Sequence, residues 1–517
     1  ILLITLYRLT LHPLADYPGP GYTAISEAYN IFSCLNGERH LQFKIWHDRY
    51  GPVVRYAPNR LSFCDEKAIS DIYGVRANTQ KSQMYGGFNH VFNATSSLTC
   101  TDRKEHTFKR RAINNALQPA QLKIFEKHLT KNMDILTNDV LKDASSSDWS
   151  SPHDLSTLIH RLLTDMIGDV VFSKSWNVQI SPTKRWIEEF FPLATSGVHA
   201  AGHMLLALKL NLQSVFLPRT MASVYQWLAV ARSQCEERIQ REESMGDGKD
   251  LFSSLLRISK DIPAKSLGMN DLVAETAIMI VAGADTTTTA LTATLFYLLM
   301  HPSILHLVRQ EIDATFPSPI DSHDTTSNLS RTTIENGASL SSCKLLRACI
   351  DEALRLSPPG PGLFPREVLA GGLLVADKWY VPAGVDVGVP IYAVQRDARY
   401  WREAHTFDPF RWLLSGSPTS SSPASESETD HHNTFMPFNF GRTSCVGKHL
   451  AYNAMSVTLA RILKTFDLEM ESGSQVSGSK FGKSKGGGWG RGNKEEFQVR
   501  DVFSSAHQGP VVRFRRR

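Results

Sequence analysis

One cysteine lies just before a helical pattern in the last part of the chain, in a segment that contains Phe438, Gly441, Arg442, Cys445 and Gly447. The first N–H groups of a helix lack partners and the helix dipole is positive at that end. We therefore expect the Cys445 thiol to lose its proton easily and to bind a metal ion as an anion. Glycines have no Cβ, which lets backbone amides or a flat macrocycle come close to the sulfur. Taken alone, the segment is more typical of a buried structural cysteine in a turn.

A second group of polar residues interrupts the apolar helix predicted over residues 270–300, and it includes Gly283, Asp285 and Thr286. A glycine inside a helix costs about 1 kcal/mol relative to alanine, and buried polar side chains cost more unless they find partners. We expect Thr286 to hydrogen-bond the preceding turn and open the helix locally, and Gly283 to leave room for a small bound molecule. A helix kink with satisfied polar side chains is the alternative explanation.

A carboxylate and a guanidinium, Glu352 and Arg355, lie three residues apart on one face of a predicted helix. An exposed pair at this spacing contributes only about 0.2–0.5 kcal/mol, so the pair alone indicates little. The three patterns nevertheless occur in the order typical of the cytochrome P-450 family, and the segment around Cys445 resembles the haem-binding signature of that family. The chain departs from the usual signature at Thr443, where the family usually has arginine.

The resemblance implies a chemical role for three residues. Cys445 would be the axial thiolate ligand of haem iron, which pushes electron density toward the iron and favours O–O cleavage. Thr286 would order a water molecule, and Asp285 would relay the protons that oxygen activation consumes.

The resemblance also implies a structural triad of Glu352, Arg355 and Arg411. A buried carboxylate shared by two guanidiniums would fasten the loop that carries Cys445 to the core. Phe410 replaces the glutamate that is common just before Arg411 in the family.

The haem of this family has two propionates, which need cationic partners where they are buried. Arg110 and Arg366 match positions of propionate-binding residues, and His106 replaces a frequent tryptophan. Arg110 follows His106 by four residues, so both lie on one helix face, and Arg111 then points away. A solvated surface arginine is the alternative at each position. The full set of predicted haem contacts is His106, Arg110, Arg366, Phe438, Gly441, Arg442, Cys445 and Gly447.

Length and composition indicate a large globular protein. The 517 residues would suggest about three domains, but the motifs run from the first third of the chain to its end and must converge on one site. We therefore expect a single haem-binding domain over residues 17–517. A net charge of +5 is too small to indicate nucleic-acid binding and suits an acidic redox partner. Seven cysteines without a CxxC pair indicate reduced thiols.

Helical patterns dominate the chain, so we predict a mainly α fold with a small β region, as in the cytochrome P-450 fold. The first helix is predicted over 38–50, beside short strands at 53–56 and 60–63. The later helices are predicted at 102–117, 119–142, 153–173, 184–197, 220–243, 270–300, 302–315 and 343–356. Three segments poor in apolar residues, 318–342, 415–433 and 472–493, are predicted to be flexible insertions.

The first six residues are almost all apolar, and Arg8 and a Tyr-Pro-Gly-Pro turn follow them. Six residues are too few for a membrane span, which needs about 20. We interpret residues 1–16 as the remnant of, or the junction to, an N-terminal membrane anchor. The catalytic domain would then face the cytosol at the endoplasmic reticulum membrane. A complete soluble protein with an apolar start is the alternative.

His199 and His203, four residues apart, could bind zinc from one helix face. The sequence shows no third ligand, so we interpret them as ordinary helix residues. Residues 190–217, which include them, resemble the region over the substrate channel, which we expect at the membrane surface. By analogy of position, four largely apolar segments without arginine or lysine contact the substrate, which indicates a lipophilic molecule. These segments are 88–98, 279–282, 361–364 and 503–507.

We therefore predict a microsomal haem-thiolate monooxygenase resembling those of filamentous fungi. It would use haem b and O2 to hydroxylate or epoxidise a lipophilic small molecule in secondary metabolism. NADPH would supply electrons through a flavoprotein reductase that docks near Arg442 and Lys448. One alternative is a haem-thiolate isomerase or dehydratase without external electrons, against which the intact pair of Asp285 and Thr286 argues. The other is a non-catalytic haem-binding interaction protein, in which Thr286→Ala would leave function unchanged.

Overall fold

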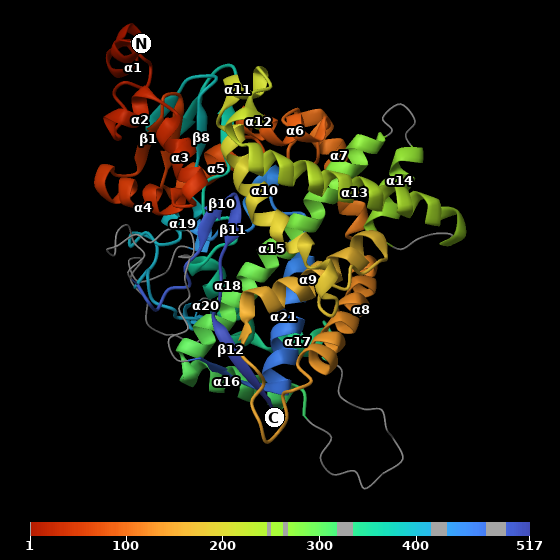
Figure 1. The fold of residues 1–517 in the computed structure, drawn as a ribbon. Coiled ribbons are helices and arrows are strands. Elements are labelled where there is room, and N and C mark those ends of the chain that lie inside the picture. Colours follow the sequence, from red (N-terminus) through yellow and green to blue (C-terminus); the bar gives the residue numbers. More distant parts are fainter. Residues whose placement is uncertain (1, 246–249, 262–266, 318–333, 415–431, 472–492) are drawn as a thin grey trace.

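The computed structural model describes residues 2–245, 250–261, 267–317, 334–414, 432–471 and 493–517. Long helices form most of the molecule, and the N-terminal helices lie beside the largest sheet at one end (Figure 1). The prediction of a mainly α fold with a small β region is confirmed.

The long helices lie close to where the sequence pattern predicts them. In the first half the helices are α1 (Leu2–Thr10), α2 (Gly21–Ile25), α3 (Ala28–Asn36), α4 (Arg39–Tyr50), α5 (Glu66–Tyr73), α6 (Gly86–Phe92), α7 (Arg103–Ala116), α8 (Pro119–Ile135), α9 (Leu155–Phe172), α10 (Trp186–Gly202), α11 (Leu205–Lys209), α12 (Gln213–Phe216) and α13 (Pro218–Met245). They continue with α14 (Leu251–Asp261), α15 (Met269–Met300), α16 (Pro302–Thr315), α17 (Ala338–Ser342), α18 (Lys344–Leu356), α19 (Ile391–Val394), α20 (Arg411–Leu414) and α21 (Lys448–Thr465). Single turns of other helix types are η1 (Gln83–Tyr85), η2 (Leu136–Val140), η3 (Pro182–Lys184), η6 (His432–Thr434) and η7 (Gly441–Thr443).

The strands form one five-stranded sheet and three smaller sheets. The strands are β1 (Val53–Ala57), β2 (Arg60–Phe63), β3 (Thr79–Lys81), β4 (His153–Asp154), β5 (Arg366–Val368), β6 (Leu373–Val375), β7 (Trp379–Val381), β8 (Asp386–Gly388), β9 (Phe466–Met470), β10 (Arg500–Val502), β11 (Ser504–Ala506) and β12 (Val511–Arg516). The large sheet has the order β1-β2-β8-β5-β3, in which only β2 and β8 run parallel, with Leu61 opposite Val387. Thr79 of β3 donates to the carbonyl of Ile72 in α5 at 2.7 Å, and the guanidinium of Arg366 in β5 lies 5.1 Å from the ring centre of Tyr73 in α5. Helix α5 in turn contacts η7, in the loop that carries Cys445.

Helix α15 is the centre of the core and packs against α9, α13, α18 and α21. Among the described residues it is the one helix that is long and apolar enough to cross a membrane, yet most of its side chains are buried by these neighbours. Its composition is therefore that of a central helix in a large core.

Helix α7, which carries two of the predicted haem contacts, begins at a capped turn. The side chain of Asp102 accepts hydrogen bonds from the backbone N–H groups of Lys104 and Glu105 at 2.9 and 2.8 Å. Such a cap satisfies donors that the first turn of a helix leaves free. The cap thus fixes where α7 starts, and with it the face that His106 and Arg110 share.

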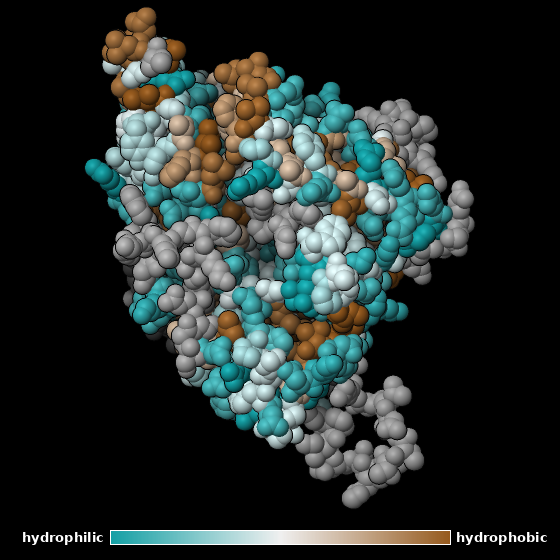
Figure 2. Space-filling view, in the orientation of Figure 1, coloured by the Kyte–Doolittle hydropathy of each residue, from teal (hydrophilic) through white to brown (hydrophobic). Residues whose placement is uncertain are grey.

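Apolar side chains are exposed at one end of the molecule. Figure 2 shows them over α1 and over α11 and α12, which lie at the same end in Figure 1. In α1 the exposed residues are Leu2, Leu3, Ile4, Leu6, Tyr7 and Leu9. In α11, in α12 and between them, the exposed residues are Leu206, Leu210, Leu212, Val215 and Phe216.

The predicted insertions lie mostly outside the described residues. Of the segment 318–342, only residues 334–342 are described, and there Ile334 and Leu340 are buried and α17 forms. Of the segments 415–433 and 472–493, only residues 432, 433 and 493 are described.

Candidate active site

The predicted ligand loop is held between η7 and the first turn of α21. The backbone N–H of Cys445 donates to the carbonyl of Phe438 at 2.7 Å, which closes the loop. Gly441 has a φ of +66°, and a Cβ there would lie 2.0 Å from the carbonyl oxygen of Tyr73 in α5. Only glycine combines this conformation with this close contact, so α5 and the loop pack directly on each other.

Cys445 differs from the other six cysteines of the chain, because its side chain is exposed and theirs are buried. All seven thiols are free, as predicted. Protein atoms nevertheless surround the Cys445 sulfur, and this desolvation raises the pKa of the thiol. The Gly447 N–H and the charges of Arg110 and Lys448 lower the pKa by less. The expectation of a readily ionised thiol is therefore wrong for the protein alone, since desolvation outweighs the helix N-terminus.

Two residues in the middle of the largely buried helix α15 are not fully covered by other parts of the described chain. Ala282 is exposed, and Thr286, one turn later, is partly exposed. The Thr286 hydroxyl donates to the Ala282 carbonyl at 2.6 Å, as predicted, while the helix runs unbroken through this turn instead of opening. Helix α15 packs on α21, the helix that follows Cys445.

Gly283 does not clear space for a bound molecule, contrary to the prediction from the sequence. A Cβ at Gly283 would lie 2.7 Å from Cδ1 of Ile167 in α9. The glycine therefore lets α9 and α15 approach closely, and this contact explains why the central helix tolerates it.

Asp285 has a partner that the sequence analysis missed. Nε2 of His160, in α9, lies 3.0 Å from Oδ1 of Asp285, and both side chains are largely buried. An ionised carboxylate only accepts hydrogen bonds, so Nε2 donates. The two residues are 125 positions apart in the sequence, and no local pattern predicts this contact.

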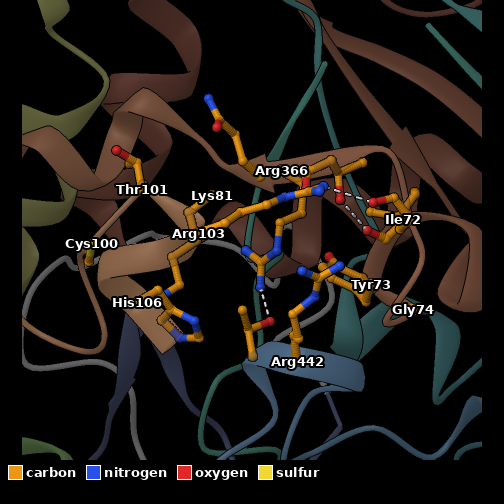
Figure 3. Close-up of a pocket in the computed structure, with 14 residues that line it drawn as sticks. Ile72, Tyr73, Gly74, Lys81, Cys100, Thr101, Arg103, His106, Arg366 and Arg442 are labelled. Atoms are coloured by element: carbon orange, nitrogen blue, oxygen red, sulfur yellow. Dashed lines mark hydrogen bonds between the residues drawn. The ribbon is translucent and has the colours of Figure 1, made fainter. Parts of the chain in front are cut away.

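A pocket with a cationic lining lies beside the Cys445 loop (Figure 3). Figure 3 shows side chains from four segments of the chain converging there, including Lys81, Arg103, His106 and Arg366. Burial, followed by the charge of Arg366, lowers the pKa of Lys81 to about 7. Burial, followed by the charges of Lys81 and Arg110, lowers the pKa of His106 to about 3. None of the described residues that line the pocket is acidic.

This cationic excess fits the carboxylates of a haem. Desolvated cations without acidic partners raise the free energy of the folded protein, and an anionic group placed among them relieves that cost. The exposed thiol and this pocket together match a thiolate-ligated cofactor that carries two carboxylates. Lys81, which the sequence analysis missed, is one of the residues that line this pocket.

The predicted propionate partners also fasten the ligand loop. Arg366 is buried, and its guanidinium donates to Oγ1 of Thr443 at 2.6 Å. Arg110 donates to the carbonyl of Ser444, whereas its neighbour Arg111 is exposed, as predicted. Arg442 is exposed, donates to the carbonyl of Val75 and lines the pocket. Phe438 packs on Tyr452 of α21, with ring centroids 5.0 Å apart.

The triad residues lie together and are fully buried. Glu352 accepts from Arg355 at 2.8 and 2.9 Å and from Nε of Arg411 at 3.2 Å. Arg355 also donates to the carbonyl of Gln395, whose side-chain Oε1 accepts from the backbone N–H of Met436 at 2.9 Å. This chain of bonds connects α18 to the segment that leads into the Cys445 loop.

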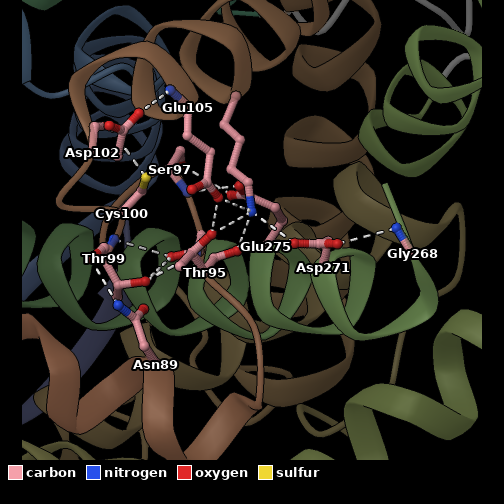
Figure 4. A network of polar contacts seen from close by, with 12 residues as sticks. Asn89, Thr95, Ser97, Thr99, Cys100, Asp102, Glu105, Gly268, Asp271 and Glu275 are labelled. Atoms are coloured by element: carbon pink, nitrogen blue, oxygen red, sulfur yellow. Dashed lines mark hydrogen bonds and ion pairs between the residues drawn. The ribbon is translucent and has the colours of Figure 1, made fainter. Parts of the chain in front are cut away.

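The segment between α6 and α7 is held to α15 by a polar network (Figure 4). Glu275 accepts from the backbone N–H and hydroxyl of Ser97 at 2.6 and 2.9 Å, and burial raises its pKa to about 7. Lys109 donates to Asp271 at 2.8 Å and to Thr95. The network fixes part of a segment that the sequence analysis assigned to substrate contact.

Three of the four predicted substrate segments meet at one aromatic ring. Phe503 lies 5.3 Å from Phe88 and 5.4 Å from Phe364, measured between ring centroids. In the fourth segment, Ala282 is exposed.

Comparisons with known proteins agree with this geometry. The cytochrome P-450 family model matches residues 18–486. The cytochrome P-450 monooxygenase poxM of Penicillium oxalicum is 33% identical over 99% of this chain and 92% of its own length. The cytochrome P-450 monooxygenase AKT7 of Alternaria alternata is 31% identical over 99% of this chain and 94% of its own length. The chain therefore belongs to the cytochrome P-450 family. It is a haem-thiolate monooxygenase, and the prediction of this class is confirmed.

Proposed function

We propose that the protein inserts one oxygen atom of O2 into a lipophilic small molecule of fungal secondary metabolism, with electrons delivered from NADPH by a flavoprotein reductase. The observation that carries this proposal is that the exposed Cys445 directly precedes α21, which packs on the buried helix α15, where the turn with Ala282 and Thr286 is open. When bound, haem b supplies the iron at which O2 is activated.

The chain's own residues then have distinct tasks. Cys445 would bind the iron as a thiolate, and the Gly447 N–H and Arg110 favour its charged form. Arg366 and the cations of the pocket would bind the propionates. The Thr286 hydroxyl, on the open face of α15, holds a water molecule. Asp285, which faces α9, passes protons to this water molecule.

Thr286→Ala tests the proposed proton delivery. We expect NADPH consumption to continue while product per NADPH falls about tenfold or more and hydrogen peroxide rises, because the hydroxyl that holds the water is lost. The amounts of product, peroxide and consumed NADPH are measured in the reconstituted enzyme. The substrate is a compound whose binding shifts the haem absorption spectrum. The matched control is Thr288→Ala, which removes a buried hydroxyl bonded to the carbonyl of Ala284 in the same way. Unchanged coupling in Thr286→Ala argues against this role.

His160→Gln tests the partner of Asp285. His160 donates to this carboxylate, so we propose that it orients Asp285 and passes it protons. We expect a fall in kcat of about tenfold or more, a larger solvent deuterium isotope effect and an unchanged reduced carbon-monoxide spectrum. His301→Gln, at the far end of α15, is the control and should match the wild type. An isotope effect equal to that of the wild type would show that His160 is outside the proton path.

The apolar end of the molecule supports attachment to a membrane surface. Exposed apolar side chains of α1 and of α11 and α12 lie at the same end, where a bilayer would bury both groups. We propose that this end rests on the endoplasmic reticulum membrane, with the catalytic domain in the cytosol. Residues 1–16 would then connect to the anchor, and residues 17–517 would form the single catalytic domain.

A further inference from the structure

Three potential metal ligands meet between α3 and α10. Cys34 lies on α3, His199 lies near the end of α10, and His203 directly follows that helix. Their ligand atoms all lie within 4.8 Å of one another, and all three side chains are buried. The third ligand, which the sequence did not show, comes from a helix 165 positions away in the sequence from His199.

The His203 ring is buried with both nitrogens lacking a hydrogen-bond partner among the described residues. A neutral imidazole carries one lone pair that can bind a metal ion. An unpaired buried ring beside a thiol and a second imidazole is therefore a set of side chains that can bind a metal ion.

The chemistry of the ligands favours zinc. A thiolate and two imidazoles suit Zn2+, whereas Mg2+ and Ca2+ prefer oxygen ligands. The guanidiniums of Arg39 and Arg60 act on the Cys34 thiol together with the carboxylates of Glu27 and Asp501, so neither sign of charge is in excess among these four groups.

We propose that Cys34, His199 and His203 bind one Zn2+ ion, with a water molecule as the fourth ligand. Zinc prefers sulfur and imidazole ligands at about 2.3 and 2.0–2.1 Å in a tetrahedron, which sets ligand atoms roughly 3.3–3.6 Å apart. Sγ of Cys34 and Nε2 of His199 are already 3.8 Å apart. Small side-chain rotations therefore complete the site.

Arg39 must release His199 when the ion binds. One of its guanidinium nitrogens lies 3.4 Å from Nε2 of His199, and another has no partner. Oδ2 of Asp501 is also buried without a partner, and Asp501 and Arg39 attract each other. Turning Arg39 toward Asp501 would replace a weak bond with an ion pair and leave Nε2 to the zinc.

The ion would fasten α10 to α3 at the edge of the substrate region. The His199 ring lies 5.6 Å from Phe503, where three of the predicted substrate segments meet. Helix α10 also leads into α11 and α12, which carry the exposed apolar residues. The site is independent of haem binding and of the proposed reaction.

The test measures zinc in the haem-loaded protein after equilibration with micromolar Zn2+ and removal of free ions. We expect one zinc per chain, one sulfur and two imidazole nitrogens in the zinc X-ray absorption spectrum, and loss of the zinc in Cys34→Ser and in His203→Gln. Because Cys34 must lose a proton, zinc affinity should fall about tenfold for each unit by which the pH is lowered. Cys64→Ser, another buried cysteine whose thiol contacts Asp397, is the control and should keep the zinc.

Three results would overturn the proposal. The first is a wild-type protein that binds no zinc under these conditions. The second is bound zinc without a sulfur ligand, and the third is zinc retained in the Cys34 and His203 variants. The zinc X-ray absorption spectrum requires only the wild-type protein, so the proposal can be tested even where a variant does not fold.

Discussion

The Cys445→Ser variant is expected to lose the strongly red-shifted Soret band that thiolate-ligated haem gives when reduced under carbon monoxide, together with all substrate oxidation. Serine keeps the shape of the loop but offers no thiolate, and the electron density that favours O–O cleavage is lost. The measurement is the absorption spectrum of the reduced protein under carbon monoxide, with haem content determined separately.

The control for this variant is Cys235→Ser, a buried cysteine whose sulfur lies 3.3 Å from the hydroxyl of Thr276. It should keep the band of the wild type. A red-shifted band that persists in Cys445→Ser would remove Cys445 as the ligand. A wild type without haem would remove the proposed chemistry altogether.

Glu352→Ala is expected to destabilise the protein by about 3–5 kcal/mol, which is a large part of the stability of an ordinary domain. The change leaves two buried guanidiniums without their carboxylate and also removes the acceptor of the Trp412 indole and the Asp408 N–H. The measurements are the midpoint of denaturant unfolding and the haem bound per chain. Asp48→Ala, which removes an exposed ion pair with Lys44, should cost at most about 0.5 kcal/mol.

The pH dependence of stability gives the same triad a second signature. The neighbouring arginines hold the pKa of Glu352 below its ordinary value of 4.5, although burial alone would raise it. The unfolded chain therefore binds the proton more readily, and the stabilisation is complete above pH 4.5 and falls away as the pH drops below it. The difference in stability between the wild type and Glu352→Gln should shrink over that range. If this difference in stability did not change with pH, the negative charge of Glu352 would not contribute to the stability of the protein.

The contacts predictable from the sequence are those that a short segment or a family motif defines. The cysteine loop, the long helices and the inward side of Arg110 belong to this class, because periodicity and spacing report on one element at a time. His160, Lys81 and Cys34 were missed because each meets its partners across long stretches of chain. The prediction for Gly283 was wrong because the sequence shows only that a side chain is missing there. It does not show which neighbouring helix fills the space.

The pKa of Cys445 illustrates a different limit. The sequence shows a helix N-terminus and nearby basic residues, all of which lower the pKa of a thiol. Desolvation depends on how many atoms surround the sulfur, and this quantity exists only in the folded molecule.

The position of α15 has a consequence for synthesis of the chain. Helices α9 and α13 precede it, but α21 begins about 150 residues after its end. At about 5–20 residues per second, α15 therefore waits roughly 7–30 seconds during synthesis with the side that packs on α21 uncovered. By length and composition, this helix could then also enter a membrane. A chaperone that covers this side until α21 emerges would keep the nascent chain out of the bilayer.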